Sequence, residues 1–127
     1  MFLSFPLALL AAASAVNACS VTVPSGSNWA MTIYGYTNCQ SGDDNESKSF
    51  HGDLTGGITK CTPFNDGGAV SGHLQSIAFN TNPNPLGLSV EFFSGTSCSG
   101  PLGSISKSTS NTTAKISLAT AFQVLYN

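Results

Sequence analysis

The sequence predicts an all-β fold, a single small β-sandwich braced by two disulfides. No stretch after residue 18 carries a sustained 3.6-residue apolar period, which argues against amphipathic helices. Short runs of apolar, β-branched and aromatic residues recur instead, separated by clusters of glycine, proline, asparagine and serine. Four cysteines, an even number, follow an apolar N-terminal segment of the kind that exported proteins carry.

Each short run is interpreted as one strand. Apolar and polar side chains alternate most clearly around Met31 and Ile33 and again over residues 122–126, as expected for strands with one buried face. Segments 24–28 and 80–85 are loops by their proline, glycine, serine and asparagine content. No interior segment is long enough to separate two domains. The predicted strands are Ser20–Val23, Ala30–Tyr36, Lys48–Leu54, Leu74–Asn80, Leu88–Phe93, Gly103–Ser108, Lys115–Leu118 and Phe122–Tyr126.

Residues 1–18 are predicted to be a secretory signal peptide. The apolar run over residues 1–13 is too short for a membrane-spanning helix, which needs about 20 residues, and small residues follow it. Cleavage is expected after Ala18, with Ala15 as the alternative. The chain would then be a single secreted, extracellular domain, 19–127, with no membrane span.

The cysteines are expected to form two disulfides. In a secreted chain Cys19, Cys39, Cys61 and Cys98 allow three connectivities, and the sequence alone leaves all three open. A bacterial lipoprotein would carry lipid on Cys19, which would leave an odd number of thiols. A zinc site is excluded, because no cysteine pair has the C-x2-C spacing.

Charge is sparse, which limits the classes of partner. Charged residues make up 8% of the chain, the net charge is −2, and no arginine is present. Nucleic acid and anionic membranes are recognised by clustered cations, whereas the lysines here are scattered. Asn45 and Asn111 head N-x-S/T sequons and are predicted glycosylation sites. No cofactor is expected, and the domain is expected to be a monomer.

One segment of the chain echoes another. When Cys39 is superposed on Cys98, the residues from Trp29 onward align with those from Leu88 onward, and apolar positions coincide. The shared pattern is a strand, a short turn, and a cysteine that fixes the next segment to the sheet. Two amphipathic strands followed by turns would also look alike without a true repeat.

The spacing Phe93-x4-Cys98-x-Gly100 resembles the hairpin signature of βγ-crystallin-like domains, aromatic-x4-aromatic-x-Gly, with cysteine in place of the second aromatic residue. The first half is similar at Tyr34-x4-Cys39. Secreted killer-toxin-like and small fungal proteins look similar. The resemblance implies a Greek-key β-sandwich and does not by itself imply a function.

Such domains often bind calcium through a short acidic and hydroxyl-bearing loop. The segment from Asp43 and Asp44 to Lys48 comes close to this pattern but ends in lysine where serine is required. A solvated loop is the preferred interpretation. The implied architecture also leads us to expect the pairs Cys39–Cys61 and Cys19–Cys98.

The titratable residues do not define an active site. Neither His51 nor His73 has a carboxylate at a spacing that suggests general acid–base catalysis, although His51 and Glu91 can be written as a pair. The G-x-S-x-G motif of serine hydrolases is absent. No catalytic or metal-binding residue is therefore assigned, and the protein is expected not to be an enzyme.

Aromatic residues are the candidates for a binding surface. Trp29, Tyr34 and Tyr36 lie close in sequence, and aromatic rings stack on sugars and anchor interfaces. Tyr34 and Tyr36 are predicted to face the side of their strand opposite Met31 and Ile33. The alternative is that all three rings complete the core.

The sequence therefore favours a non-enzymatic secreted binding protein. It would bind an extracellular glycan or cell-surface component, either as a carbohydrate-binding wall protein or as a toxin- or effector-like protein. The alternatives are a small secreted hydrolase of ribonuclease or glycosidase type, using His51 and a carboxylate, and a structural wall protein.

Overall fold

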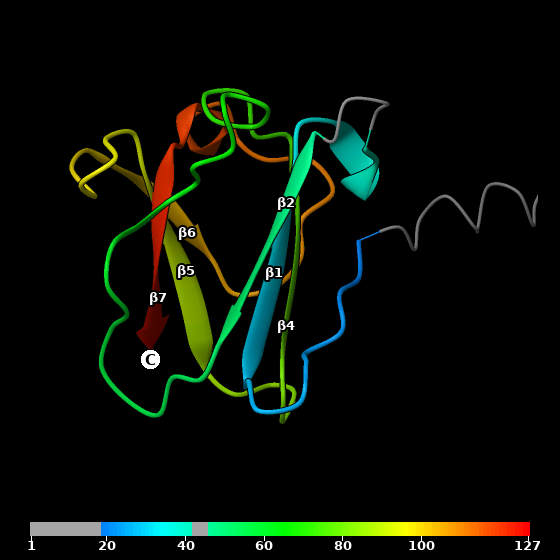
Figure 1. Cartoon of the computed structure of the whole chain (residues 1–127), viewed down its shortest axis with the longest axis vertical. Helices are drawn as coiled ribbons and strands as arrows, with labels where there is room; N and C mark the ends of the chain where they lie inside the picture. The colour runs from blue at the N-terminus through cyan, green and yellow to red at the C-terminus, as the bar shows by residue number, and fades with distance from the viewer. Residues whose placement is uncertain (1–18, 42–45) are drawn as a thin grey trace, which may run out of the picture.

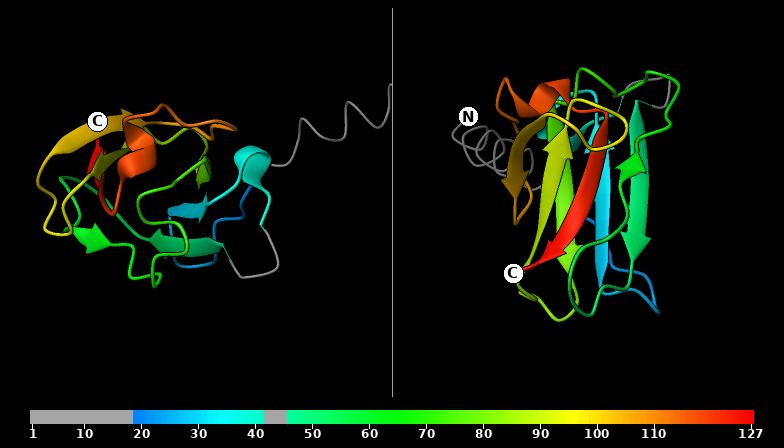
Figure 2. Two further views of the ribbon diagram at one scale, coloured as in Figure 1. Left: turned by 90° about the horizontal axis from the view of Figure 1, so that it is seen from above. Right: turned by 90° about the vertical axis from the view of Figure 1, so that its left-hand side faces the viewer.

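The computed structural model describes residues 19–41 and 46–127. Within these residues the chain forms two antiparallel sheets packed face to face (Figures 1 and 2). The predicted signal peptide, Asp43, Asp44 and the sequon asparagine Asn45 lie outside the described residues. The predicted all-β sandwich is confirmed.

The first sheet has the strand order β2-β1-β4. Strand β1 (Trp29–Tyr34) lies between β2 (Ser47–Gly52) and β4 (Ser76–Thr81), antiparallel to both. Alternation sends Trp29, Met31 and Ile33 into the sandwich, with at most 5% of each side chain exposed. An isolated bridge between Ile77 and Thr109 adds a short further segment beside β4.

The second sheet has the order β3-β7-β5-β6. It contains β3 (Thr62–Pro63), β5 (Leu88–Phe93), β6 (Pro101–Ile105) and β7 (Ala121–Tyr126), all antiparallel to their neighbours. Two 3-10 turns complete the described elements, η1 (Thr37–Cys39) after β1 and η2 (Ile116–Leu118) before β7.

The topology consists of two Greek keys, each of which contributes one segment to the sheet of the other. In the first half β1, β2 and β4 share a sheet while β3 crosses to pair with β7. In the second half β5, β6 and β7 share a sheet while Thr109 crosses to pair with Ile77. Strands β1 and β5 are the equivalent inner strands, which confirms the sequence echo as a repeat of topology.

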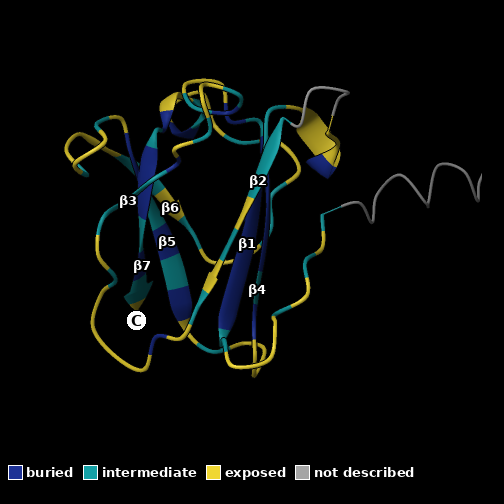
Figure 3. Cartoon of the chain, viewed as in Figure 1, coloured by how far each residue is buried: buried dark blue, intermediate teal, exposed yellow. Residues whose placement is uncertain are grey.

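The core lies between the sheets (Figure 3). Its centre is a cluster of aromatic rings in which Phe122 contacts Trp29, Phe50 and Phe64 at centroid separations of 6.2, 4.7 and 6.3 Å. Phe64 and Phe92 are fully buried. Burying such large rings is the main stabilising contribution that a domain of this size can make.

Several predicted elements differ from the observed ones. Residues 20–23 run alongside the sandwich without entering a sheet, and the predicted strand at 115–118 contains the 3-10 turn η2. Strand β1 ends at Tyr34, before Tyr36. Strand β3 was missed because it has only two residues, one of them a proline, which cannot donate to a ladder.

The disulfide pairing expected from the resemblance is wrong. The bonds join Cys19 to Cys39 and Cys61 to Cys98, with Cα–Cα distances of 5.0 and 5.7 Å. The physical reason is the crossing of β3, which carries Cys61 away from the first sheet to the second, beside the turn that follows β5. Two disulfides in a small domain are typical of an oxidising compartment.

In the part of the chain that the structure describes, no helix has the length and apolar character needed to cross a bilayer.

Candidate functional site: two grooves in the sides of the sandwich

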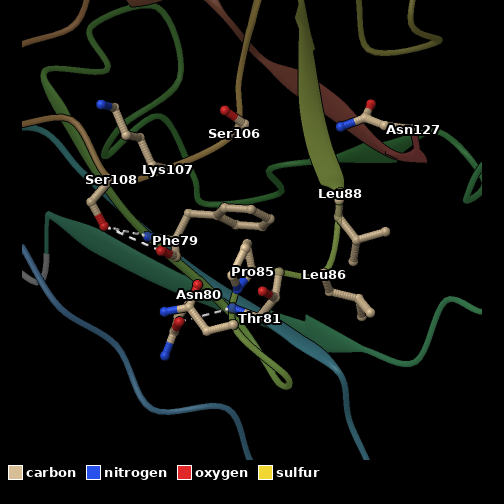
Figure 4. A pocket seen from close by; sticks show the side chains of 12 residues that line it. Phe79, Asn80, Thr81, Pro85, Leu86, Leu88, Ser106, Lys107, Ser108 and Asn127 are labelled. Carbon is tan, nitrogen blue, oxygen red and sulfur yellow. Dashed lines mark hydrogen bonds between the residues drawn. The ribbon is translucent and has the colours of Figure 1, made fainter.

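The larger groove, which we call the Asn127 groove, has a volume of about 560 Å³ (Figure 4). It is formed where the end of β4 meets the loop that enters β5, with residues 106–108 and Asn127 closing the other sides. Its walls therefore come from both sheets and from both halves of the topology. A volume of this size is within the range of small-molecule sites in proteins.

One side of the Asn127 groove is apolar. Phe79, Pro85, Leu86 and Leu88 line it, and Figure 4 shows these side chains gathered in the middle of the site. Phe79 and Leu88 also belong to the core, so the structure holds their positions. This side offers a surface that the apolar face of a ligand can contact.

Some polar groups of the Asn127 groove are engaged within the protein. The Asn80 side-chain nitrogen donates to the Val21 carbonyl at 3.2 Å, and its Oδ1 accepts from the Thr81 N–H at 2.9 Å. Ser108 Oγ accepts from the Phe79 N–H at 2.9 Å. These bonds fix the backbone and side chains that shape the groove.

Other polar groups of the groove are available to a ligand. Among the described residues, the side chains of Asn84, Ser106 and Lys107 have no hydrogen-bond or ion-pair partner. Asn127 accepts from Ser89 Oγ through its Oδ1 at 3.0 Å, which leaves its side-chain N–H groups as donors. The groove thus combines an apolar side with several unengaged donors and acceptors.

The smaller groove, which we call the Trp29 groove, has a volume of about 440 Å³. It opens between β2, the edge of the first sheet, and the segment that leads into β3, the edge of the second. Trp29, Phe50 and Phe122 form its apolar walls. Its remaining lining residues are polar or glycine, namely Ser49, His51, Gly52, Asp53, Thr59 and Thr62.

Trp29 carries an unusual polar group. Its side chain is 5% exposed, and its Nε1–H is the one buried side-chain polar atom without a hydrogen-bond partner among the described residues. Buried donors are normally paired, because an unpaired one has lost its bond to water without replacement. The Nε1 edge of the indole lies against Gly52, which itself lines the groove.

His51 and Asp53 lie at the exposed rim of the Trp29 groove. His51 Nδ1 and Ser27 Oγ are hydrogen-bonded at 3.0 Å. Ser49 and Thr59 are partly engaged, with Ser49 Oγ bonded to Thr32 Oγ1 at 2.8 Å and Thr59 Oγ1 accepting from the Val124 N–H at 2.8 Å.

The structure separates the three aromatic residues predicted to form one surface. Trp29 and Tyr34 begin and end β1, and Trp29 faces the interior. Tyr34 is half-buried, and burial raises the pKa of its hydroxyl. Tyr36 is 44% exposed and lies beyond the strand, where its carbonyl accepts from Ser76 Oγ. Of the three, only Trp29 lines one of the two grooves described above.

The other predicted residues lie apart from each other. Glu91 is on β5 and does not line the Trp29 groove, so it is not brought to His51. The His73 ring bonds the Ala69 carbonyl. Asn111 is exposed in the loop before η2. No group of three or more His, Cys, Asp or Glu side chains that could hold a metal ion occurs within residues 19–41 and 46–127.

No sequence pattern singles out Asn80, Asn84 and Asn127. Residues 80–85 have the composition of a loop, and Asn127 simply follows the last predicted strand. They meet because the loop returns the chain from β4 in one sheet to β5 in the other, and β7 ends beside the start of β5. Only the topology shows this proximity.

The fold and its grooves define a disulfide-braced Greek-key β-sandwich with two side grooves. No protein-family model and no curated protein matches the sequence. The chain is similar in structure to a βγ-crystallin domain from Flavobacterium johnsoniae, with 17% identity and a TM-score of 0.49 over 76% of this chain and 94% of that one. It is also similar to the N-terminal domain of Protein S, with 11% identity and a TM-score of 0.48 over 76% of this chain and 96% of that one. A third similar structure is a mutant βγ-crystallin domain from Clostridium beijerinckii, with 16% identity and a TM-score of 0.49 over 77% of this chain and 99% of that one.

Proposed function

We propose that the protein is a secreted, non-enzymatic binding module that holds an extracellular glycan in the Asn127 groove. The observation that carries this proposal is the set of unengaged polar groups around an apolar side, namely the side chains of Asn84, Ser106 and Lys107 and the side-chain N–H groups of Asn127. Sugars present hydroxyl groups at their edges and apolar faces between them. Sites with an apolar wall and a few converging polar groups are well suited to such ligands.

Two further features support an extracellular role. The disulfides Cys19–Cys39 and Cys61–Cys98 persist in oxidising surroundings. The expected signal peptide over residues 1–18 would deliver the chain there. A glycan on the producing organism would make the protein a wall component, and a glycan on another organism would make it toxin- or effector-like.

The test is retention of the oxidised, purified protein on insoluble chitin, β-glucan, cellulose and mannan. We expect retention on one polymer and its loss in Asn84→Ala/Lys107→Ala. A matched control is Gln40→Ala/Lys115→Ala, which removes an amide and a lysine from exposed positions outside both grooves. Equal retention of the two variants would refute the assignment of this groove, and failure to bind any polymer would refute the glycan itself.

A second candidate function is a small secreted hydrolase centred on His51. The observation in its favour is the bond between Ser27 Oγ and His51 Nδ1, because a hydroxyl and an imidazole within hydrogen-bond reach are the parts of an activated nucleophile. Asp53 lies in the same groove. Hydrolysis of esters, glycans or RNA by purified protein, abolished in both Ser27→Ala and His51→Ala, would establish this function.

A further inference from the structure

We propose that the Trp29 groove is a second ligand-binding site, selective for a sugar unit that carries an acetamido group. The inference rests on the proposed function in one respect, that the ligand is a carbohydrate. It goes beyond that function by assigning a separate site with its own chemistry. Three observations carry it: the position of the groove in the fold, the unpartnered indole N–H, and the composition of the rim.

The two grooves share four lining positions that are equivalent in the two halves of the topology. Trp29 begins β1 and lines one groove, and Leu88 begins the equivalent strand β5 and lines the other. Met31 pairs with Phe50 as Val90 pairs with Ile105. When this register is continued toward the end of each hairpin, residues 51–53 correspond to residues 106–108. Both sets of residues line their grooves. The repeat therefore builds a side groove in each half.

The indole N–H identifies the kind of atom that the ligand must supply. An indole nitrogen donates a hydrogen bond and does not accept one, so its partner must be an acceptor. The N–H is covered in the structure and lies against Gly52, next to the exposed Asp53 at the end of β2. Under the proposal, a ligand carbonyl bonds this N–H only after the Gly52 backbone moves outward, which breaks the 2.8 Å hydrogen bond from the Asn28 N–H to the Gly52 carbonyl, and the new bond then satisfies the donor.

The walls and rim supply the rest of an acetamido-sugar site. Phe50 and Phe122 offer apolar contact to a methyl group. Asp53 and His51 at the rim can bond sugar hydroxyls, and Thr62 Oγ1, which donates to the Lys60 carbonyl at 3.1 Å, can accept from one. The Asn127 groove instead holds Lys107 and no acidic residue, so the two sites favour different sugar units.

The chain has a single tryptophan, so its fluorescence reports on this groove directly. The full disulfide-bonded protein would be titrated with oligomers of N-acetylglucosamine, glucosamine and glucose. We expect a saturable change in emission with the acetylated oligomer alone. Asp53→Ala/Thr62→Ala should weaken that binding at least tenfold, whereas Glu91→Ala/Thr96→Ala, a carboxylate and a threonine outside both grooves, should not.

Trp29→Phe tests the N–H itself, since it keeps an aromatic ring and removes the donor. Calorimetric titration of this variant should show no binding of the acetylated oligomer at this site. Thermal unfolding of the variant should remain cooperative. If this variant does not fold, the rim pair Asp53→Ala/Thr62→Ala still tests the proposal.

The outcomes separate the two proposals. Polysaccharide retention through the Asn127 groove with no change in Trp29 emission for any oligomer would overturn the second site and leave the proposed function standing. An equal response to glucose and acetylated oligomers would overturn the acetamido assignment. If Trp29 emission changes but no polysaccharide retention depends on Asn84 and Lys107, the assignment of the Asn127 groove is overturned and that of the Trp29 groove is supported.

Discussion

The indole of Trp29 packs over Gly52, its direct partner across the β1–β2 ladder. A Cβ at position 52 would lie 2.9 Å from the indole Nε1 and 3.0 Å from two ring carbons. The absence of a side chain at Gly52 therefore leaves the space that the indole of Trp29 occupies.

The first prediction concerns this contact. Gly52→Ala should lower the free energy of unfolding by about 1–3 kcal/mol, because the new methyl group forces the indole or the strand to move. Urea unfolding followed by far-ultraviolet circular dichroism measures the loss. Gly56→Ala is the matched control, since a Cβ there meets nothing within 4 Å. Equal stability of the two variants would contradict the close packing of Trp29 on Gly52.

The second prediction concerns Asp66, whose carboxylate organises the loop between β3 and β4. Desolvation raises the pKa of this group, but hydrogen bonds from the Ser71 hydroxyl and the Val70, Ser71 and Gly68 N–H groups outweigh it, and the pKa falls below its ordinary value. A lowered pKa means that the ionised form stabilises the fold. This contribution is fully present above the unfolded-state pKa, near 3.8, and is lost as the pH falls through the lower folded-state value.

Asp66→Asn should accordingly lower the free energy of unfolding by about 1.5–3 kcal/mol at pH 7, the usual range for a hydrogen bond to a charged group. The difference from the unaltered protein should shrink below pH 4. Urea unfolding over the pH range tests this, with Asp53→Asn as a control at an exposed carboxylate. A difference that stays constant down to pH 2 would show that ionisation of Asp66 is not responsible.

The third prediction concerns Asn38, in the turn η1. Its backbone has a φ of 59° and a ψ of 28°, the left-handed region, and its side chain is exposed. A β-branched residue is strained there, so Asn38→Val should cost about 1–2 kcal/mol. Asn38→Gly should cost less, because glycine adopts this conformation without strain. Thermal unfolding of both variants decides the order, and a more stable valine variant would contradict it.

The fourth prediction concerns the disulfides. Peptide mapping without reduction should yield Cys19 linked to Cys39 and Cys61 linked to Cys98. Replacing either pair with alanine should remove about 3 kcal/mol of stability, and the Cys61–Cys98 pair, which closes the longer segment of 37 residues against 20, should cost about 0.5 kcal/mol more in the chain-entropy model. Recovery of Cys39 joined to Cys61 would refute the crossing of β3.

Local sequence patterns predicted the longer strands well. The predicted strand Leu88–Phe93 matches β5, and alternation at Met31 and Ile33 identified the buried face of β1. These features depend on neighbouring residues, whose side chains point alternately to core and solvent. The 3-10 turn η2 was predicted as a strand because its short apolar run has no periodicity to distinguish the two.

Features that depend on pairing over long distances could not be predicted. The disulfide partners follow from the crossing of β3, which two residues of sequence do not reveal. The Asn127 groove joins β4, the loop into β5, residues 106–108 and the end of β7. Trp29 was a predicted binding-surface residue, and its place in a groove depends on a glycine opposite it in the ladder.

The exchange of β3 and Thr109 between the halves means that neither half is an autonomous folding unit. A protease cut in the loop between β4 and β5, around residues 82–87, would give two fragments that each lack an edge segment supplied by the other. The Cys61–Cys98 bond would hold the fragments together after cleavage. A nicked molecule would thus migrate as two pieces only after reduction, and the separated pieces would regain structure only when mixed.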